Sequence, residues 1–142
     1  MENIDARVLI LDDNHRVLFV LEKEKLVTLP NGANFTKPSK WGMPGGRGEA
    51  EDGDEIDAVI REVKEEVGLS VYIDEQSRVG RQEKGYSKVV FIGELAAGTI
   101  KINPEEILDC KWFPIRVLYD NGFNMYSSHR QMAQELLRKL GK

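Results

Sequence analysis

The first part of the chain carries the apolar patterns of β-strands. Residues 6–11 and 16–21 are rich in Val, Leu and Ile, and the Asp-Asp-Asn-His sequence between them supplies turn residues, so the two segments predict a hairpin. Residues 22–40 are polar and contain two prolines and an Asn-Gly pair. They predict a long loop, and long loops in compact domains are often functional. Residues 41–44 predict a short strand that leads into a glycine-rich loop.

The most regular apolar pattern lies over residues 54–67 and has the period of an α-helix. Its aliphatic side chains fall on one stripe: Ile56, Val59, Ile60, Val63 and Val67. Asp54 is suited to cap the start of this helix, and Gly68 stands where the left-handed residue after a helix is expected.

The second half of the chain predicts further strands and a closing helix. Strands are predicted over residues 70–74, 78–83, 88–96, 99–102 and 110–113. A short helix is expected after Pro114, and residues 128–140 have the pattern of an amphipathic helix. Strands around a central helix, with another helix at the end, predict an α+β or mixed α/β fold whose helices pack on a sheet. The length fits one domain over residues 1–142.

Composition narrows the class of protein. Hydrophobic residues are 41% and charged residues 31% of the chain, which is typical of a globular protein. The net charge of −4 argues against a surface that binds the nucleic-acid backbone, although a metal would still permit a small anionic substrate. The longest apolar runs, such as residues 17–21, are too short to span a bilayer, and the acidic first residues are unlike a signal peptide. Cys110 is the single cysteine, so we expect it to be buried and the location to be reducing and cytoplasmic.

Candidate chemistry gathers on the central helix. Glu62, Glu65 and Glu66 are related by steps of three and four, so they share an arc of about 100° beside the apolar stripe. Like charges so placed repel, and a cation would remove that cost; carboxylate oxygens suit Mg²⁺ or Mn²⁺ better than zinc. The alternative is a solvated acidic face softened by Lys64. The glycine-rich loop before the helix and the neighbouring Arg61, which can orient a carboxylate, favour a metal site.

This segment resembles the Nudix box, whose pattern is G-x5-E-x7-R-E-U-x-E-E-x-G-U with U an aliphatic residue. Residues 61–69 match at every fixed position, and residues 41–46 are similar to the family's usual entry into the box. The order of the surrounding strands also agrees, so the resemblance covers most of the chain.

The first acid of the box is displaced. The position eight before Arg61 is Gly53, where the family has Glu, and counting forward from Gly46 reaches Asp52 instead. The loop therefore holds one extra residue. Three acids are candidates to replace the missing one: Asp52, Glu51 or Glu49.

The resemblance implies a Nudix-like α/β/α sandwich with a mixed central sheet, on which the box helix and the C-terminal helix pack. It implies a Mg²⁺-dependent hydrolase, with Mn²⁺ as a possible substitute. The bond cleaved would be a phosphoanhydride in a nucleoside diphosphate linked to another moiety, such as an NTP, a dNTP or a dinucleoside polyphosphate. The rival interpretation is a Nudix-like module that senses a nucleotide or nucleotide sugar without cleaving it; retention of the helical acids favours the enzyme.

The resemblance also assigns roles to residues. The expected metal ligands are Glu62, Glu65, Glu66 and the carbonyl of Gly45. The expected catalytic residues are Glu62, Arg61 and Glu106, which lies six residues before Trp112; Glu105 is the next candidate, and a solvent-facing turn is the alternative for both. The expected substrate contacts are Trp41, Arg47 and Tyr86.

Several features leave alternatives open. Phe35, Phe123 and Tyr126 are further candidates to stack on a base, with core or loop packing as the alternative. His15 and His129 have no partner pattern and are expected at the surface. The expected partner is a small nucleotide. The particular substrate and the choice between monomer and homodimer stay open.

Overall fold

The N-terminal hairpin is present as predicted. The computed structural model describes residues 3–141, and strands β1 (Ile4–Leu11) and β2 (Arg16–Glu22) pair antiparallel around residues 12–15. The remaining elements follow in order: β3 (Lys25–Thr28), β4 (Asn34–Lys37), β5 (Trp41–Gly42), β6 (Gly45–Arg47), α1 (Glu55–Val67), β7 (Ser70–Glu83), β8 (Tyr86–Ala97), β9 (Ile107–Pro114), the 3₁₀ helix η1 (Ile115–Tyr119) and α2 (Ser127–Lys139).

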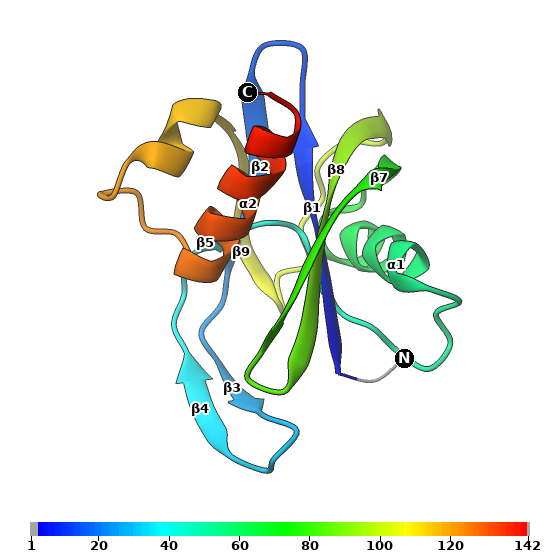
Figure 1. Ribbon diagram of the computed structural model, residues 1–142, viewed down its shortest axis with the longest axis vertical. Coiled ribbons are helices and arrows are strands. Elements are labelled where there is room, and N and C mark those ends of the chain that lie inside the picture. Colours follow the sequence, from blue (N-terminus) through cyan, green and yellow to red (C-terminus); the bar gives the residue numbers. More distant parts are fainter. Residues whose placement is uncertain (1–2, 142) are drawn as a thin grey trace.

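A mixed sheet lies between the two helices, which confirms the predicted fold class (Figure 1). Its main path is β5-β2-β1-β8-β7, with β6 added to β1 and β9 added to β2. β1 and β8 run parallel, whereas the other pairs are antiparallel.

Successive residues of β1 point into two separate cores. Val8 and Ile10 pack with α1 residues such as Val63, whereas Leu9 packs with α2 residues such as Leu136. All five of these side chains are fully buried. Since each such burial contributes roughly 1.5–3 kcal/mol, the alternation in β1 fixes both helices to the sheet.

Helix α1 begins and ends at the residues that its sequence predicts. The Asp54 side chain accepts a hydrogen bond from the Asp57 backbone N–H at 2.8 Å. Gly68 has φ +73° and donates its N–H to the Lys64 carbonyl, as expected for the residue after a helix.

The segment predicted as a long loop contains a second hairpin. β3 and β4 pair with each other, from Lys25 opposite Lys37 to Thr28 opposite Asn34, and form a separate two-stranded sheet that projects from the molecule (Figure 1). The prediction of a loop was wrong here because the hairpin has too few buried positions to give a strand pattern.

The strand predicted over residues 99–102 is absent from the described chain. This segment crosses the end of α1, where Lys101 N–H donates to the Val67 carbonyl and Asn103 N–H to the Glu66 carbonyl, both at 2.8 Å. Its backbone therefore satisfies terminal carbonyls of the helix and not a neighbouring strand.

Other boundaries differ from the predictions as well. The strands predicted over residues 70–74 and 78–83 are one strand, β7, whose register shifts between Asp74 and Val79. The glycine-rich loop begins with a strand, β6, and the final strand β9 is longer than predicted.

Within residues 3–141, no helix combines the length and apolar character needed to cross a membrane.

The sheet divides along its length, and the division makes room for a pocket. β1 and β2 pair only beside their turn, at Ile10 with Leu18 and Leu11 with Val17. Farther along, β6 pairs with β1 and β5 pairs with β2. Asp5 and Arg7 on β1 and Glu22 on β2, at the ends where the two strands no longer pair, line that pocket.

Candidate active site

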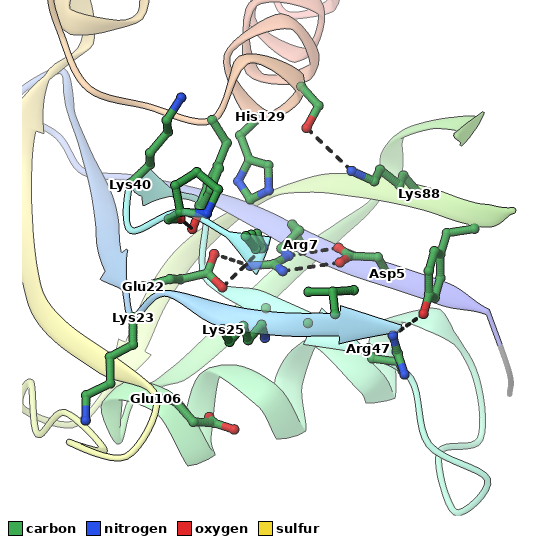
Figure 2. Close-up of a pocket in the computed structure, with 18 of the residues that line it drawn as sticks. Asp5, Arg7, Glu22, Lys23, Lys25, Lys40, Arg47, Lys88, Glu106 and His129 are labelled. Atoms are coloured by element: carbon green, nitrogen blue, oxygen red, sulfur yellow. Dashed lines mark hydrogen bonds and ion pairs between the residues drawn. The ribbon is translucent and has the colours of Figure 1, made fainter. Parts of the chain in front are cut away.

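A pocket of about 760 Å³ occupies this division of the sheet (Figure 2). Four parts of the fold line it: the open ends of β1 and β2, the acidic face of α1, the β3–β4 hairpin, and the first residues of α2. β6, the turn between β7 and β8, and the loop before β9 also contribute to the wall.

Three carboxylates meet in this pocket. Glu62, Glu66 and Glu106 each offer an oxygen, and these oxygens lie within 4.8 Å of one another. Glu62 and Glu66 are one turn apart on α1. Glu106 comes from the loop before β9, and its backbone is fixed on both sides, because its carbonyl accepts from Lys23 N–H and its N–H donates to the Asn103 carbonyl.

Burial makes negative charge costly in this acid cluster. Glu66 is only 5% exposed, and burial raises its pKa to about 8. Burial also raises the pKa of Glu62. A divalent cation would offset this cost, and three carboxylate oxygens are ligands that Mg²⁺ or Mn²⁺ accepts. The cluster therefore fits the metal that the sequence suggests.

Gly45 brings the backbone close to the cluster. Its N–H donates to Glu66 Oε1 at 3.0 Å. It has φ +133°, and a side chain there would collide with the Ala6 carbonyl oxygen, so only glycine fits. Gly45 thus lies beside Glu66 on the pocket wall, and the metal-ligand role that the resemblance implies for its carbonyl stays a prediction.

Arg61 fastens the loop before α1 to the acidic face of the helix. Its guanidinium donates to both oxygens of Asp52, at 2.9 and 3.0 Å, and to Glu62 and Glu65 at 3.0 Å each. Hydrogen bonding to Asp52 raises the pKa of Arg61, and the same bond lowers the pKa of Asp52. Glu49 lies farther from Arg61, at 3.5 Å.

The structure separates the predicted acids into two groups. The Glu65 side chain is 54% exposed and is held by Arg61, and among the described residues it is not part of the acid cluster. Asp52 is likewise committed to Arg61 and to the Glu49 N–H. Glu105 is exposed, and its backbone N–H bonds to Asn103.

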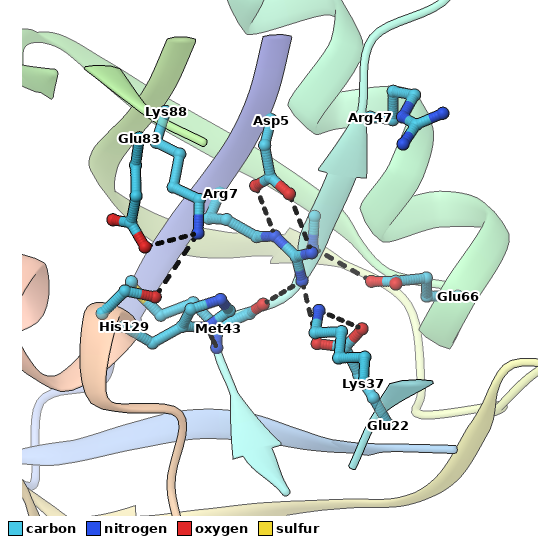
Figure 3. A network of polar contacts seen from close by, with 12 residues as sticks. Asp5, Arg7, Glu22, Lys37, Met43, Arg47, Glu66, Glu83, Lys88 and His129 are labelled. Atoms are coloured by element: carbon cyan, nitrogen blue, oxygen red, sulfur yellow. Dashed lines mark hydrogen bonds and ion pairs between the residues drawn. The ribbon is translucent and has the colours of Figure 1, made fainter. Parts of the chain in front are cut away.

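A buried charge network that the sequence reasoning missed lies behind the acid cluster (Figure 3). Arg7 is 4% exposed and donates to Asp5 at 2.8 and 3.2 Å, to Glu22 at 3.1 Å and to the Met43 carbonyl at 3.1 Å. Burial alone would raise the pKa of Glu22, but Arg7 and Lys37 outweigh it and lower the value to about 2. The sequence did carry one indication of this network, because Arg7 and Glu22 are charged residues within or next to apolar strand segments.

The prediction that His129 lies at the surface was wrong. The ring is 6% exposed, and its Nδ1 accepts a hydrogen bond from the Met43 N–H at 2.9 Å. Burial and the nearby charge of Arg7 lower its pKa to about 3. His129 lies near the start of α2 and lines the pocket. No local sequence pattern predicts this position. His15 is exposed in the β1–β2 turn.

The predicted substrate contacts fall in different places. Arg47 and Tyr86 line the pocket, and the Tyr86 hydroxyl accepts from Arg47 and donates to the Thr28 carbonyl. Trp41 is not a lining residue; it packs against Phe113 and Phe123, with ring centroids 4.8 and 6.4 Å away.

The other aromatic candidates are also engaged within the protein. Phe35 and Tyr126 line the pocket, and lysine ammonium groups lie 4.8 Å from the Phe35 ring and 4.5 Å from the Tyr126 ring. Phe123 belongs to the cluster around Trp41. Cys110 is buried, as predicted, and burial raises the pKa of its thiol to about 12.

The two-helix sandwich and the carboxylates of α1 define a mixed α/β protein with a candidate metal site on its first helix. The chain belongs to the Nudix family, because the model of the NUDIX domain matches residues 1–136.

Individual relatives agree with this assignment. A Caenorhabditis elegans protein named for the nudix hydrolases is 39% identical over 84 residues, which are 58% of this chain and 22% of that protein. The mRNA-decapping enzyme subunit 2 of Saccharomyces cerevisiae is 28% identical over 106 residues, 68% of this chain and 11% of that protein. The chain thus spans less than a quarter of the length of these curated relatives.

Solved structures show the same fold. The MutT protein of Methanosarcina mazei Go1 has a TM-score of 0.73 at 18% identity, over 98% of this chain and 95% of that one. A UDP-X diphosphatase has a TM-score of 0.70 at 22% identity, over 97% of this chain and 62% of that one. At these identities the likeness concerns the fold alone.

Proposed function

We propose that this chain is a Mg²⁺-dependent pyrophosphohydrolase. Its substrate would be a nucleoside diphosphate linked to another moiety, such as an NTP, a dNTP or a dinucleoside polyphosphate. The observation that carries the proposal is the meeting of Glu62, Glu66 and Glu106 within 4.8 Å in one pocket of a chain that belongs to the Nudix family.

Glu62, Glu66 and Glu106 would hold the cation, with the neighbouring Gly45 carbonyl as a further candidate ligand. When bound, a divalent cation neutralises phosphate charge and acidifies a water molecule. Mn²⁺ suits the same oxygen ligands.

The chain's own residues would divide the remaining work. A carboxylate of the acid cluster takes a proton from the water whose oxygen forms the new bond to phosphorus. The bridging P–O bond breaks, and the leaving phosphate keeps its electron pair. Glu106 is the preferred base, because it is exposed to the pocket while Glu66 is buried and bonded to Gly45. Arg61 acts as a positioning residue, since it holds Glu62 and the loop containing Asp52.

Substrate phosphates would enter between the acid cluster and Arg47. The Arg47 side chain is exposed at the pocket wall and is steadied by the Tyr86 hydroxyl. Guanidinium groups pair well with phosphate oxygens. Trp41 has no part in this proposal, because it packs in an aromatic cluster away from the pocket lining.

The test is phosphate and nucleotide release over a panel of NTPs, dNTPs, dinucleoside polyphosphates, ADP-ribose and nucleotide sugars. We expect turnover of at least one class with Mg²⁺, loss of turnover in EDTA, and recovery when Mg²⁺ is restored. Glu66→Gln is the inactive comparison. Tight binding of a panel member without turnover would overturn the proposal in favour of a sensing module.

A further inference from the structure

Arg7 places a positive charge in the middle of the buried strand β1. It is 4% exposed and lies between Ala6 and Val8, which are both fully buried. Burial of a guanidinium is costly, and a buried ion pair often stabilises a protein no more than apolar side chains of the same volume would. Stability of the sheet is therefore a weak reason for an arginine here, and its position on the pocket wall points to another role.

Arg7 and its neighbour hold the segment that leads into β6. The Arg7 Nη1 donates to the Met43 carbonyl at 3.1 Å, and the Arg7 backbone lies opposite Gly45 in the pairing of β1 with β6. Val8 donates its N–H to the Pro44 carbonyl at 3.0 Å. Three consecutive residues of this segment are thus fixed against β1, and one of them is fixed by a side chain.

The same segment contacts the acid cluster within the next three residues. Gly45 N–H donates to Glu66 Oε1 at 3.0 Å. Gly46 lies against the other carboxylate of α1, since a Cβ added to it would be 2.9 Å from Glu62 Oε2. Only two soft dihedrals per residue separate the Met43 carbonyl from these contacts, so a displacement of this carbonyl would be carried to both.

Two acids fix the orientation of the Arg7 guanidinium itself (Figure 3). Asp5 accepts from Nε at 2.8 Å and from Nη2 at 3.2 Å, and Glu22 accepts from Nη1 at 3.1 Å. Guanidinium–carboxylate pairs have a planar, two-pronged geometry, so the group that reaches Met43 is held in one direction. A lysine would carry the same charge but lacks this fork.

We propose that Arg7 is a positioning residue for the acid cluster, because it holds residues 43–45 where Gly45 meets Glu66. Its hydrogen bonds within the described chain go to Asp5, Glu22 and Met43, so it acts through the backbone and not by touching the cluster. The consequence for catalysis rests on the proposed hydrolase function. The consequences for the geometry of Gly45 and for metal affinity do not need turnover.

Arg7→Lys tests the proposal in the full-length protein. In EDTA, we expect amide hydrogen exchange of Gly45 to become about tenfold faster, because its position is no longer held by the fork. The apparent Kd for Mn²⁺, measured by electron paramagnetic resonance, should rise about tenfold, as is typical when an outer partner of a metal site is lost. With Mg²⁺ and a substrate, kcat should fall at least about tenfold while KM stays within about twofold.

A second variant separates positioning from the pairing of buried charges. Asp5→Asn, Arg7→Met and Glu22→Gln made together remove the cation and both of its acids, so neither acid is left without its cation. The Met43 carbonyl still loses its donor. We therefore expect the same loss of Mn²⁺ affinity and the same faster exchange of Gly45 as in Arg7→Lys. Recovery of both to within about twofold of the wild type would overturn the proposal.

Arg78→Lys is the matched control, because Arg78 holds Glu55 of α1 through a similar fork, at 2.7 and 2.9 Å, but lies outside the pocket lining. It should leave Mn²⁺ affinity and Gly45 exchange within about twofold of the wild type. The proposal fails if Arg7→Lys also leaves both unchanged, or if Arg78→Lys shifts both as much. Absence of turnover in the wild type would instead count against the hydrolase function, and Gly45 exchange in EDTA would still decide the role of Arg7.

Discussion

Arg61 donates two hydrogen bonds to the Asp52 carboxylate, from Nε at 2.9 Å and from Nη2 at 3.0 Å. The same guanidinium donates to Glu62 at 3.0 Å. Asp52, one of the three candidates for the first acid of the box, is therefore linked to the acid cluster through the arginine.

Asp52→Asn should consequently be a mild change. It weakens a charge-assisted pair, so we expect the free energy of unfolding to fall by about 1–2 kcal/mol and kcat to fall about tenfold or less. Glu62→Gln, which removes a member of the cluster, should lower kcat by more than about 100-fold. Urea unfolding and steady-state kinetics measure the two effects. Equal losses of kcat would show that Asp52 touches the metal or the substrate.

Glu66→Gln should abolish most activity and yet spare the fold. Its folded-state pKa, about 8, lies above the ordinary 4.5, so in EDTA its charge costs stability progressively as pH rises through this window. The variant avoids that cost, and its advantage in urea unfolding should grow from pH 5 to pH 9. Glu65→Gln is the neighbouring control, with a smaller loss of kcat because the Glu65 side chain is 54% exposed. The reverse ranking would contradict the assigned cluster.

Glu106→Gln should reduce kcat at least tenfold with little change in KM. A general base typically contributes about 10²–10⁴-fold, and Glu106 is the acid of the cluster that faces the open pocket. Glu105→Gln is the matched control and should have a smaller effect. Comparable loss in both variants would point to a general disturbance of the loop. Wild-type kcat in Glu106→Gln would leave the base among the acids of α1.

His129 should make stability depend on pH. Its pKa is lowered from 6.5 to about 3, so the stability it confers is present above pH 6.5 and is lost as pH falls toward 3. His129→Asn keeps an acceptor for the Met43 N–H and cannot titrate. Between pH 7.5 and pH 5.5, the free-energy advantage of the wild type over this variant should shrink by about 1 kcal/mol in urea unfolding. A constant difference would mean that the buried ring can be protonated without penalty.

Tyr86→Phe should loosen the β3–β4 hairpin. The Tyr86 hydroxyl links Arg47 to the Thr28 carbonyl, and the variant loses both contacts but keeps the ring. We expect faster amide hydrogen exchange in residues 25–37, with unchanged exchange in β1 and β8. Tyr72→Phe, at an exposed tyrosine of β7, is the control. Unaltered exchange in the hairpin would show that other contacts hold it.

Local patterns were sufficient for the elements with strong periodicity. The apolar stripe of α1, its Asp54 cap and Gly68 end, and the hairpin of β1 and β2 all agree with expectation, because their burial repeats along the chain. The hairpin of β3 and β4 escaped notice because its stability comes from pairing and turn geometry with few buried positions.

The residues of the candidate site likewise fall into those that local sequence patterns predict and those that they do not. Residues 61–69 pointed to the carboxylates of α1, since one helix places them by its own geometry. The sequence did not show which of these carboxylates lie near Glu106. The loop that carries Glu106 is positioned by backbone hydrogen bonds to Lys23 and Asn103, and these two residues are far apart in the sequence. Arg7 and His129 were missed because their environments are built by three or more separate elements, which no window of sequence contains.

The β3–β4 hairpin shares no strand pairing with the seven-stranded sheet. It nevertheless supplies a large part of the pocket wall, including Lys25, Leu26 and Phe35. Sequence drift or deliberate grafting in this segment can therefore reshape what the pocket admits while leaving both cores and the acids of α1 untouched. The hairpin and the acids of α1 belong to separate stretches of the chain, so a library confined to residues 24–36, which spares Lys37 and its ion pair with Glu22, would test whether the hairpin selects the substrate.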